Sequence, residues 1–143
     1  MNHTNKLDDF KVNVKIKLAA LWTSVMFCYI YEDYFELYVP KKLERIISGD
    51  GLLNTPMKLF SASFVLIIPA LMIFLSILLI PKLSRLINII FGTLYTALML
   101  WIASNYSDKW LTFAVFFAIV ESIITSIIVL YAWKWPRQNQ LNT

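Results

Sequence analysis

The chain has 143 residues, of which 59% are hydrophobic and only 15% are charged, and its net charge is +4. Soluble domains are about half apolar and a quarter charged, so a water-soluble fold of this size has no interior that would hide such a surplus. The composition excludes an ordinary soluble protein. It predicts one membrane domain over residues 1–143, with no separate soluble catalytic domain.

Four apolar segments run through the chain, and each is long enough to cross a bilayer as a helix. They cover residues 18–39, 59–80, 86–104 and 111–133. The links between the second, third and fourth segments are so short that these neighbours must run in opposite directions. The sequence therefore predicts an all-α fold, a transmembrane four-helix antiparallel bundle, in which residues 40–58 form the extracytoplasmic loop.

The basic residues flank the apolar segments, as expected for side chains that meet lipid headgroups. Eight Lys and Arg residues lie on the side of the two termini, and five lie on the other side. This excess predicts a multi-pass protein of the plasma (inner) membrane with both termini in the cytoplasm. The difference is modest, so the inverted orientation remains an alternative.

The loop is expected to contain a short helix that begins at Pro40, because proline is favoured in the first turn of a helix. Leu43, Ile46 and Ile47 are expected to face lipid. Gly49 and Gly51 would then end the helix.

Pro69 lies near the centre of the second segment and predicts a kink, because proline removes one backbone donor. The hydroxyl groups of Ser61, Ser63 and Ser76 are candidates to satisfy the carbonyl groups that the kink frees.

Small and aromatic residues predict further contacts between helices and lipid. Gly92, Thr93 and Thr96 suggest a strip on which a neighbouring helix packs closely. Rings near the segment ends are typical of interfacial belts. The expected inner belt is Trp22, Tyr131, Trp133 and Trp135, and the outer belt is Tyr34, Tyr38, Trp101 and Trp110.

Carboxylates within the apolar segments are the candidate functional residues. An acid at the centre of a membrane helix costs about 3 kcal/mol, so it needs a partner or a role. Glu32 and Glu36 share a helix face with Tyr29, and Asp33 lies beside that face. None of the four apolar segments contains a Lys or Arg that could pair with Glu121. Its partner must therefore be a hydroxyl, an amide, water, another acid or a ligand. We expect at least one of these carboxyls to hold a proton at neutral pH.

If the first and fourth segments are neighbours, Glu32 and Glu121 lie at similar depths and can face one pocket. Its expected uncharged lining is Tyr29, Asn88, Thr93 and Thr96. Alternatively, the first segment ends early, and Asp33 and Glu36 pair with Lys58 or Lys109 among the headgroups.

Motifs for catalysis are missing from the sequence, which has no glycine-rich phosphate loop, nucleophile elbow or paired histidine. A single cysteine, Cys28, and a single histidine, His3, give no pair that would form a disulfide or hold a metal. We therefore expect no catalytic residue, cofactor or metal. Nucleic acid is not an expected partner either.

Residues 31–40 (YEDYFELYVP), residues 68–88, which begin IPALM, and residues 131–136 (YAWKWP) resemble a bacterial family of small four-span membrane proteins of unknown function. The resemblance covers nearly all of residues 17–136. It implies a four-helix inner-membrane protein and no particular chemistry.

Three functions remain open for such a protein. The first is binding or transport of a proton or of a small polar or cationic ligand at Glu121 and Glu32. The second is a structural or regulatory role through helix association, and the third is an intramembrane enzyme that acts on a lipid-like substrate. Membrane lipids are expected partners. Transport would need a homo-oligomer, because four helices form thin walls for a pathway.

Overall fold

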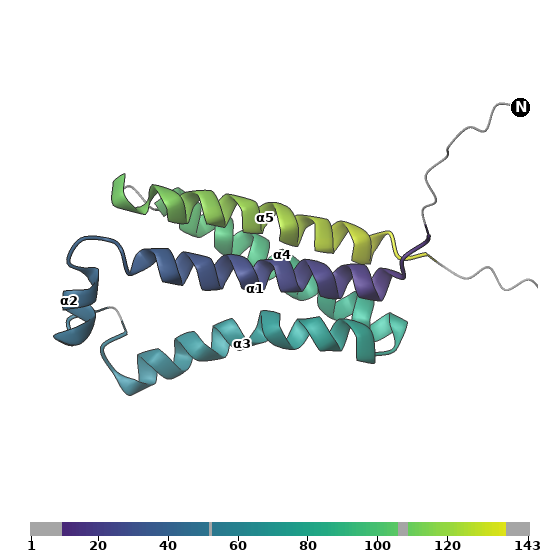
Figure 1. Cartoon of the computed structure of the whole chain (residues 1–143). Coiled ribbons are helices and arrows are strands. Elements are labelled where there is room, and N and C mark those ends of the chain that lie inside the picture. Colours follow the sequence, from purple (N-terminus) through teal and green to yellow (C-terminus); the bar gives the residue numbers. More distant parts are fainter. Residues whose placement is uncertain (1–9, 52, 106–108, 137–143) are drawn as a thin grey trace, which may run out of the picture.

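The computed structural model describes residues 10–51, 53–105 and 109–136, so His3 lies outside the described residues (Figure 1). The described residues are mostly helical and contain no strand. The long helices are α1 (Val14–Glu36), α3 (Pro56–Leu78), α4 (Pro81–Asn105) and α5 (Thr112–Trp133), with a short helix α2 (Lys42–Ile47) and a 3-10 turn η1 (Lys109–Leu111). Within these described ranges, four helical stretches are long and apolar enough to cross a membrane, the fourth of them η1 together with α5. The prediction of an all-α fold with four apolar helices is confirmed.

The long helices form an antiparallel ring in which each contacts two neighbours. α1 contacts α3 and α5, and α4 also contacts α3 and α5. Figure 1 shows α1 beginning and α5 ending at one end of the bundle, which we call the termini end. α2 lies at the opposite end, which we call the loop end. This arrangement makes α1 and α5 neighbours, as a shared pocket requires.

Helix α1 lies slightly earlier in the chain than the apolar segment suggested. Asn13 caps it, since its side-chain oxygen accepts a hydrogen bond from the backbone N–H of Lys15 at 2.9 Å. The helix ends at Glu36, and turns follow as far as Lys41, whose φ of 61° is left-handed. The polar Asn13 cap sets the start of α1, and a search for apolar residues does not detect such a cap.

The predicted loop helix is confirmed as α2. It begins at Lys42, two residues after Pro40, because the left-handed Lys41 precedes its first turn. Leu43, Ile46 and Ile47 are exposed, as expected for residues that face lipid. Gly49 follows the helix with a φ of 78°, a conformation that favours glycine.

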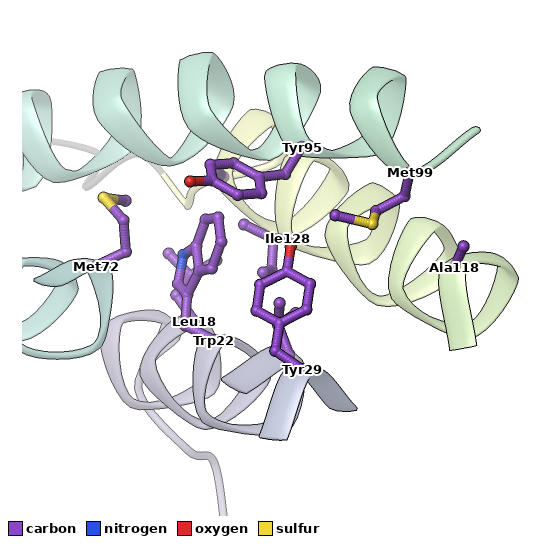
Figure 2. Close-up of a cluster of buried hydrophobic side chains, with 10 residues drawn as sticks. Leu18, Trp22, Tyr29, Met72, Tyr95, Met99, Ala118 and Ile128 are labelled. Atoms are coloured by element: carbon purple, nitrogen blue, oxygen red, sulfur yellow. The ribbon is translucent and has the colours of Figure 1, made fainter. Parts of the chain in front are cut away.

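The core of the bundle lies between all four long helices (Figure 2). Trp22 of α1 is fully buried and packs edge-on against Tyr95 of α4, with ring centroids 6.0 Å apart. The placement of Trp22 in an interfacial belt was therefore wrong. Trp22 shares the inward face of α1 with Leu18 and Tyr29, at helical spacing. Trp101, Trp110 and Trp133 are exposed, as an interfacial belt requires.

Pro69 divides α3 into two halves that differ in burial. The buried residues of this helix are Pro69, Met72 and Ser76, all in its C-terminal half. Figure 1 shows the N-terminal half sloping away from α1 toward the loop end. Its side chains, such as Phe60 and Phe64, are largely exposed. α3 is therefore held in the bundle at the termini end and is separated from it at the loop end.

The carbonyl that Pro69 frees is satisfied from another helix. Proline at position 69 leaves the carbonyl group of Val65, four residues earlier, without its helical donor. The hydroxyl of Tyr95 on α4 donates a hydrogen bond to this carbonyl oxygen at 2.5 Å. Ser61, Ser63 and Ser76 instead donate to Met57, Leu59 and Met72. The expectation that these serines satisfy the freed carbonyl was wrong.

Helices α4 and α5 approach each other closely at Gly92. A Cβ atom at this position would lie 2.8 Å from Cγ2 of Val129, so a larger residue would force a shift. One turn further on, the Thr96 hydroxyl donates to the Thr125 hydroxyl at 2.7 Å. Thr93 is exposed and takes no part in this contact. Two of the three residues of the predicted strip therefore join the helices.

At the termini end, basic side chains cap two helices. The Lys15 ammonium donates to the carbonyl oxygens of Ile77 at 3.0 Å and Leu79 at 2.5 Å, at the end of α3. Arg85 donates to the carbonyl oxygen of Trp133 at 3.4 Å, at the end of α5. Cations near helix C-termini are favourable because the last carbonyl groups carry partial negative charge.

Candidate functional site

The bundle buries two groups of polar side chains, and the first is fully hydrogen-bonded. Asn88 accepts a bond from the Trp22 indole nitrogen at 2.8 Å, and its amide nitrogen donates to the Ser84 carbonyl at 2.8 Å. The same nitrogen lies 3.1 Å from the Ser76 hydroxyl, and Ser84 Oγ donates to the Ser76 carbonyl at 2.9 Å. These four residues, the Asn88 cluster, join α1, α3 and α4. The expectation that Asn88 lines the pocket of Glu121 was wrong, because its amide has partners here.

Glu121 of α5 belongs to the second group and is fully buried. Both of its carboxyl oxygens lack a hydrogen-bond partner among the described residues. The nearby hydroxyls are occupied elsewhere: Ser122 donates to the Ile119 carbonyl, and Thr125 to the backbone carbonyl of Glu121, each at 2.8 Å. The sequence allowed a hydroxyl as the partner of this carboxyl. Neither Ser122 nor Thr125, the nearby hydroxyls of α5, is that partner.

Tyr29 of α1 is the second buried group without a partner. Its hydroxyl makes no hydrogen bond within the described residues. Figure 2 shows its ring extending from α1 into the interior of the bundle, with the hydroxyl oxygen at the inner tip. Tyr29 lies seven residues before the end of α1, and Glu121 lies nine residues after the start of α5. At 1.5 Å per residue their depths differ by about 3 Å.

Glu32 is half-buried and lies one turn closer to the loop end than Tyr29. The Glu32 carboxyl lies close enough to Tyr29 and Glu121 to act on them electrostatically, and the Asp33 carboxyl lies close enough to act on Glu121. We call Tyr29, Glu32 and Glu121 the Glu121 cluster. Its residues come from α1 and α5, which are neighbours, as the shared depth of Glu32 and Glu121 suggested.

The other two candidate acids have different surroundings. Asp33 is exposed. Glu36, the last residue of α1, forms an ion pair with Lys42. The alternative in which α1 ends early is therefore supported for Glu36, but its partner is Lys42 rather than Lys58 or Lys109.

The chemistry open to the Glu121 cluster follows from its missing partners. An ionised carboxylate in an apolar interior is costly unless a cation or several donors surround it. No basic side chain forms an ion pair with Glu121 in the described ranges, where Lys42–Glu36 is the only salt bridge. A proton or a cation would remove this cost. The Tyr29 hydroxyl can donate to, or accept from, a ligand at the same depth.

A family model described as "Family of unknown function (DUF6326)" matches residues 5–143. The chain belongs to the DUF6326 family. The search of curated proteins and the search of solved structures gave no match. Membership of DUF6326 confirms the resemblance to a family of unknown function, and it assigns no ligand or reaction to the Glu121 cluster.

The loop end contains a polar pocket that the sequence reasoning missed. It has a volume of about 530 Å³ and lies between the end of α1, α2, the start of α3 and Leu111. Its polar lining consists of Glu36, Lys42, Arg45, Asp50, Asn54 and Lys58. We call it the loop pocket. The helical spacing of Leu43, Ile46 and Ile47 indicated only a lipid-facing helix, whereas the charges of this loop come together only when the chain turns between the end of α1 and the start of α3.

Proposed function

We propose that this DUF6326 member is an integral membrane protein that binds a proton or a small polar or cationic ligand at Glu121. Tyr29 and Glu32 provide the other contacts. The observation that carries this proposal is the full burial of Glu121 with no partner for either carboxyl oxygen. Polar groups buried for structural reasons are almost always hydrogen-bonded, as the Asn88 cluster is. A buried acid without partners is better explained by a proton or a ligand that binds and dissociates.

The proposed site suits a proton or a cation better than an anion. The three side chains of the Glu121 cluster offer carboxyl and hydroxyl oxygens and no basic group. A carboxyl can hold the proton itself, and carboxyl and hydroxyl oxygens can accept hydrogen bonds from a small polar or cationic ligand. Transport would require a second copy, because four helices give thin walls to a pathway. We therefore propose a dimer or a larger assembly for the transporting form.

We propose that the protein lies in the plasma (inner) membrane with both termini in the cytoplasm, since the Lys and Arg excess favours that orientation. Reporter fusions after residues 50, 83, 107 and 143 are then external, internal, external and internal. A cytoplasmic signal at residue 50 would show the inverted orientation.

A hydrophobic carbodiimide tests the proposed site, because it reacts with a carboxyl in an apolar setting. We expect labelling of Glu121, less labelling at high pH or with a bound cation, and none in Glu121→Gln. Glu44→Gln is the matched control, since Glu44 lies exposed on α2. Failure of Glu121 to react between pH 5 and 9, in a folded protein, would reject the site.

A structural or regulatory role through helix association is the second candidate. It is supported by the N-terminal half of α3, where Met57, Phe60 and Phe64 are exposed and largely without neighbours in the bundle. If Glu121→Leu leaves ligand adducts unchanged while Phe60→Ala and Phe64→Ala disrupt an oligomer, this second function replaces the first.

A further inference from the structure

We propose that the loop pocket binds the phosphate group of a membrane phospholipid. This inference is independent of the Glu121 cluster. The loop pocket lies at the end of the apolar helices, where lipid headgroups would meet the protein. Its lining carries three basic and two acidic side chains, so the lining is positive by one charge.

The basic groups of the loop pocket are not all neutralised by acids. Lys42 is paired with Glu36. The ammonium of Lys58 donates to the side-chain oxygen of Asn54 at 2.9 Å, and Nε of Arg45 donates to the Lys41 carbonyl at 3.3 Å. Neither Lys58 nor Arg45 forms an ion pair within the described ranges.

Asp50 is the remaining acid of the lining, and it accepts a hydrogen bond from the Ser48 hydroxyl at 3.0 Å. Two cations therefore face this pocket against one unpaired acid. An anion that enters it would complete the charge balance.

Phosphate is an anion well suited to the side chains of Arg45 and Lys58. Arginine offers a planar fork of donors for phosphate oxygens, and lysine offers a compact charge. The chain continues from Lys58 into the exposed apolar half of α3, including Phe60 and Phe64. A lipid with its phosphate at Arg45 and Lys58 can therefore lay an acyl chain along this surface. Free phosphate has the same charge but gains nothing from the apolar surface.

Native mass spectrometry of the delipidated full chain in detergent tests this site. The protein is titrated with phosphatidylglycerol, with diacylglycerol, which has acyl chains but no phosphate, and with inorganic phosphate. One basic side chain near a lipid headgroup contributes about a fivefold change in affinity. We expect Arg45→Gln and Lys58→Gln each to weaken phosphatidylglycerol binding by about that factor.

Lys109→Gln is the matched control, because Lys109 lies at the same end of the bundle but does not line the pocket. It should leave binding unchanged. Equal loss in this control, no loss in the pocket variants, or equally tight binding of diacylglycerol would overturn the proposal. Inorganic phosphate that binds with the same dependence on Arg45 and Lys58 would support the phosphate site and assign it to a free anion.

Helix content by circular dichroism checks that each variant is folded. Arg45→Lys provides a second test if Arg45→Gln does not fold, because it keeps the charge and removes the planar fork. We expect it to retain most of the binding. Full loss with an intact fold would show that charge does not hold the ligand.

Discussion

The Asn88 cluster and the Glu121 cluster are both buried polar groups between apolar helices, yet their hydrogen bonding is opposite. Asn88 has partners for its amide oxygen and nitrogen, drawn from three helices. Glu121 and Tyr29 have none in the described residues. A satisfied network stabilises one arrangement of helices, whereas an unsatisfied group destabilises it until a partner binds. This difference indicates that the Asn88 cluster, at the termini end, has a structural role. The Glu121 cluster, nearer the loop end, is the candidate site.

Replacing Asn88 by leucine is the most severe way to break the first cluster. It leaves the Trp22 indole N–H without its buried acceptor and removes the Asn88 donor from the Ser76 hydroxyl, which keeps its own bond to the Met72 carbonyl. We expect a loss of about 3 kcal/mol in the free energy of unfolding, measured by steric trapping in bicelles. Asn105→Leu, at an exposed position, is the control and should have little effect. An unchanged stability of Asn88→Leu would show that the network contributes nothing.

The same type of substitution at Glu121 should act in the opposite direction. Glu121→Leu removes a buried acid without partners, and we expect the free energy of unfolding to rise by about 2 kcal/mol. The steric-trapping assay that measures Asn88→Leu gives this value directly. Glu44→Leu on exposed α2 is the matched control. Destabilisation by Glu121→Leu would mean that the carboxyl has a structural partner, and the comparison of the two clusters would fail.

A double-mutant cycle tests the bond between Tyr95 and the Val65 carbonyl. Tyr95→Phe should lower stability by about 1 kcal/mol, because it leaves that carbonyl without a donor. In Pro69→Ala the backbone N–H of residue 69 can donate instead, so Tyr95→Phe should then have almost no effect. Pro69→Ala alone should be tolerated or mildly stabilising. Equal effects of Tyr95→Phe in both backgrounds would contradict this role.

The smallest expected effect concerns the cap of α3 at the termini end. Lys15→Gln removes a cation from the last carbonyl groups of α3, and we expect a loss of about 0.5 kcal/mol in the free energy of unfolding. Lys11→Gln, at an exposed position before α1, is the control. If the two variants are equally stable in chemical denaturation, the cap does not stabilise the helix.

The number and class of the helices could be predicted from the sequence because apolar length alone determines them. Four long apolar segments predicted α1, α3, α4 and α5, and the glycines after residue 48 predicted the end of α2. The helix ends were less predictable, since Asn13 and Lys41 set them through a cap and a left-handed turn. The orientation and the boundaries of a single membrane domain remain predictions.

The candidate site was predictable in part. Glu121 stood out because an acid without a base is unusual in an apolar segment, and its burial agrees with that reasoning. The partners of Trp22, Asn88 and Tyr95 could not be predicted, because they lie on other helices and depend on how the helices rotate. Lys42 was likewise not predicted as the partner of Glu36, because only the left-handed turn at Lys41 brings Lys42 close to Glu36.

The uneven burial of the helices has a consequence for the order in which they assemble. α4 and α5 meet closely at Gly92 and are joined by Thr96 and Thr125, so this hairpin can form as a first unit. α3 buries only Pro69, Met72 and Ser76, and its last turns are fixed by Lys15 from α1. α3 is therefore the helix expected to join last and to separate first under force. A pulling experiment would extract it from its loop-end half toward Pro69 before the other three helices yield.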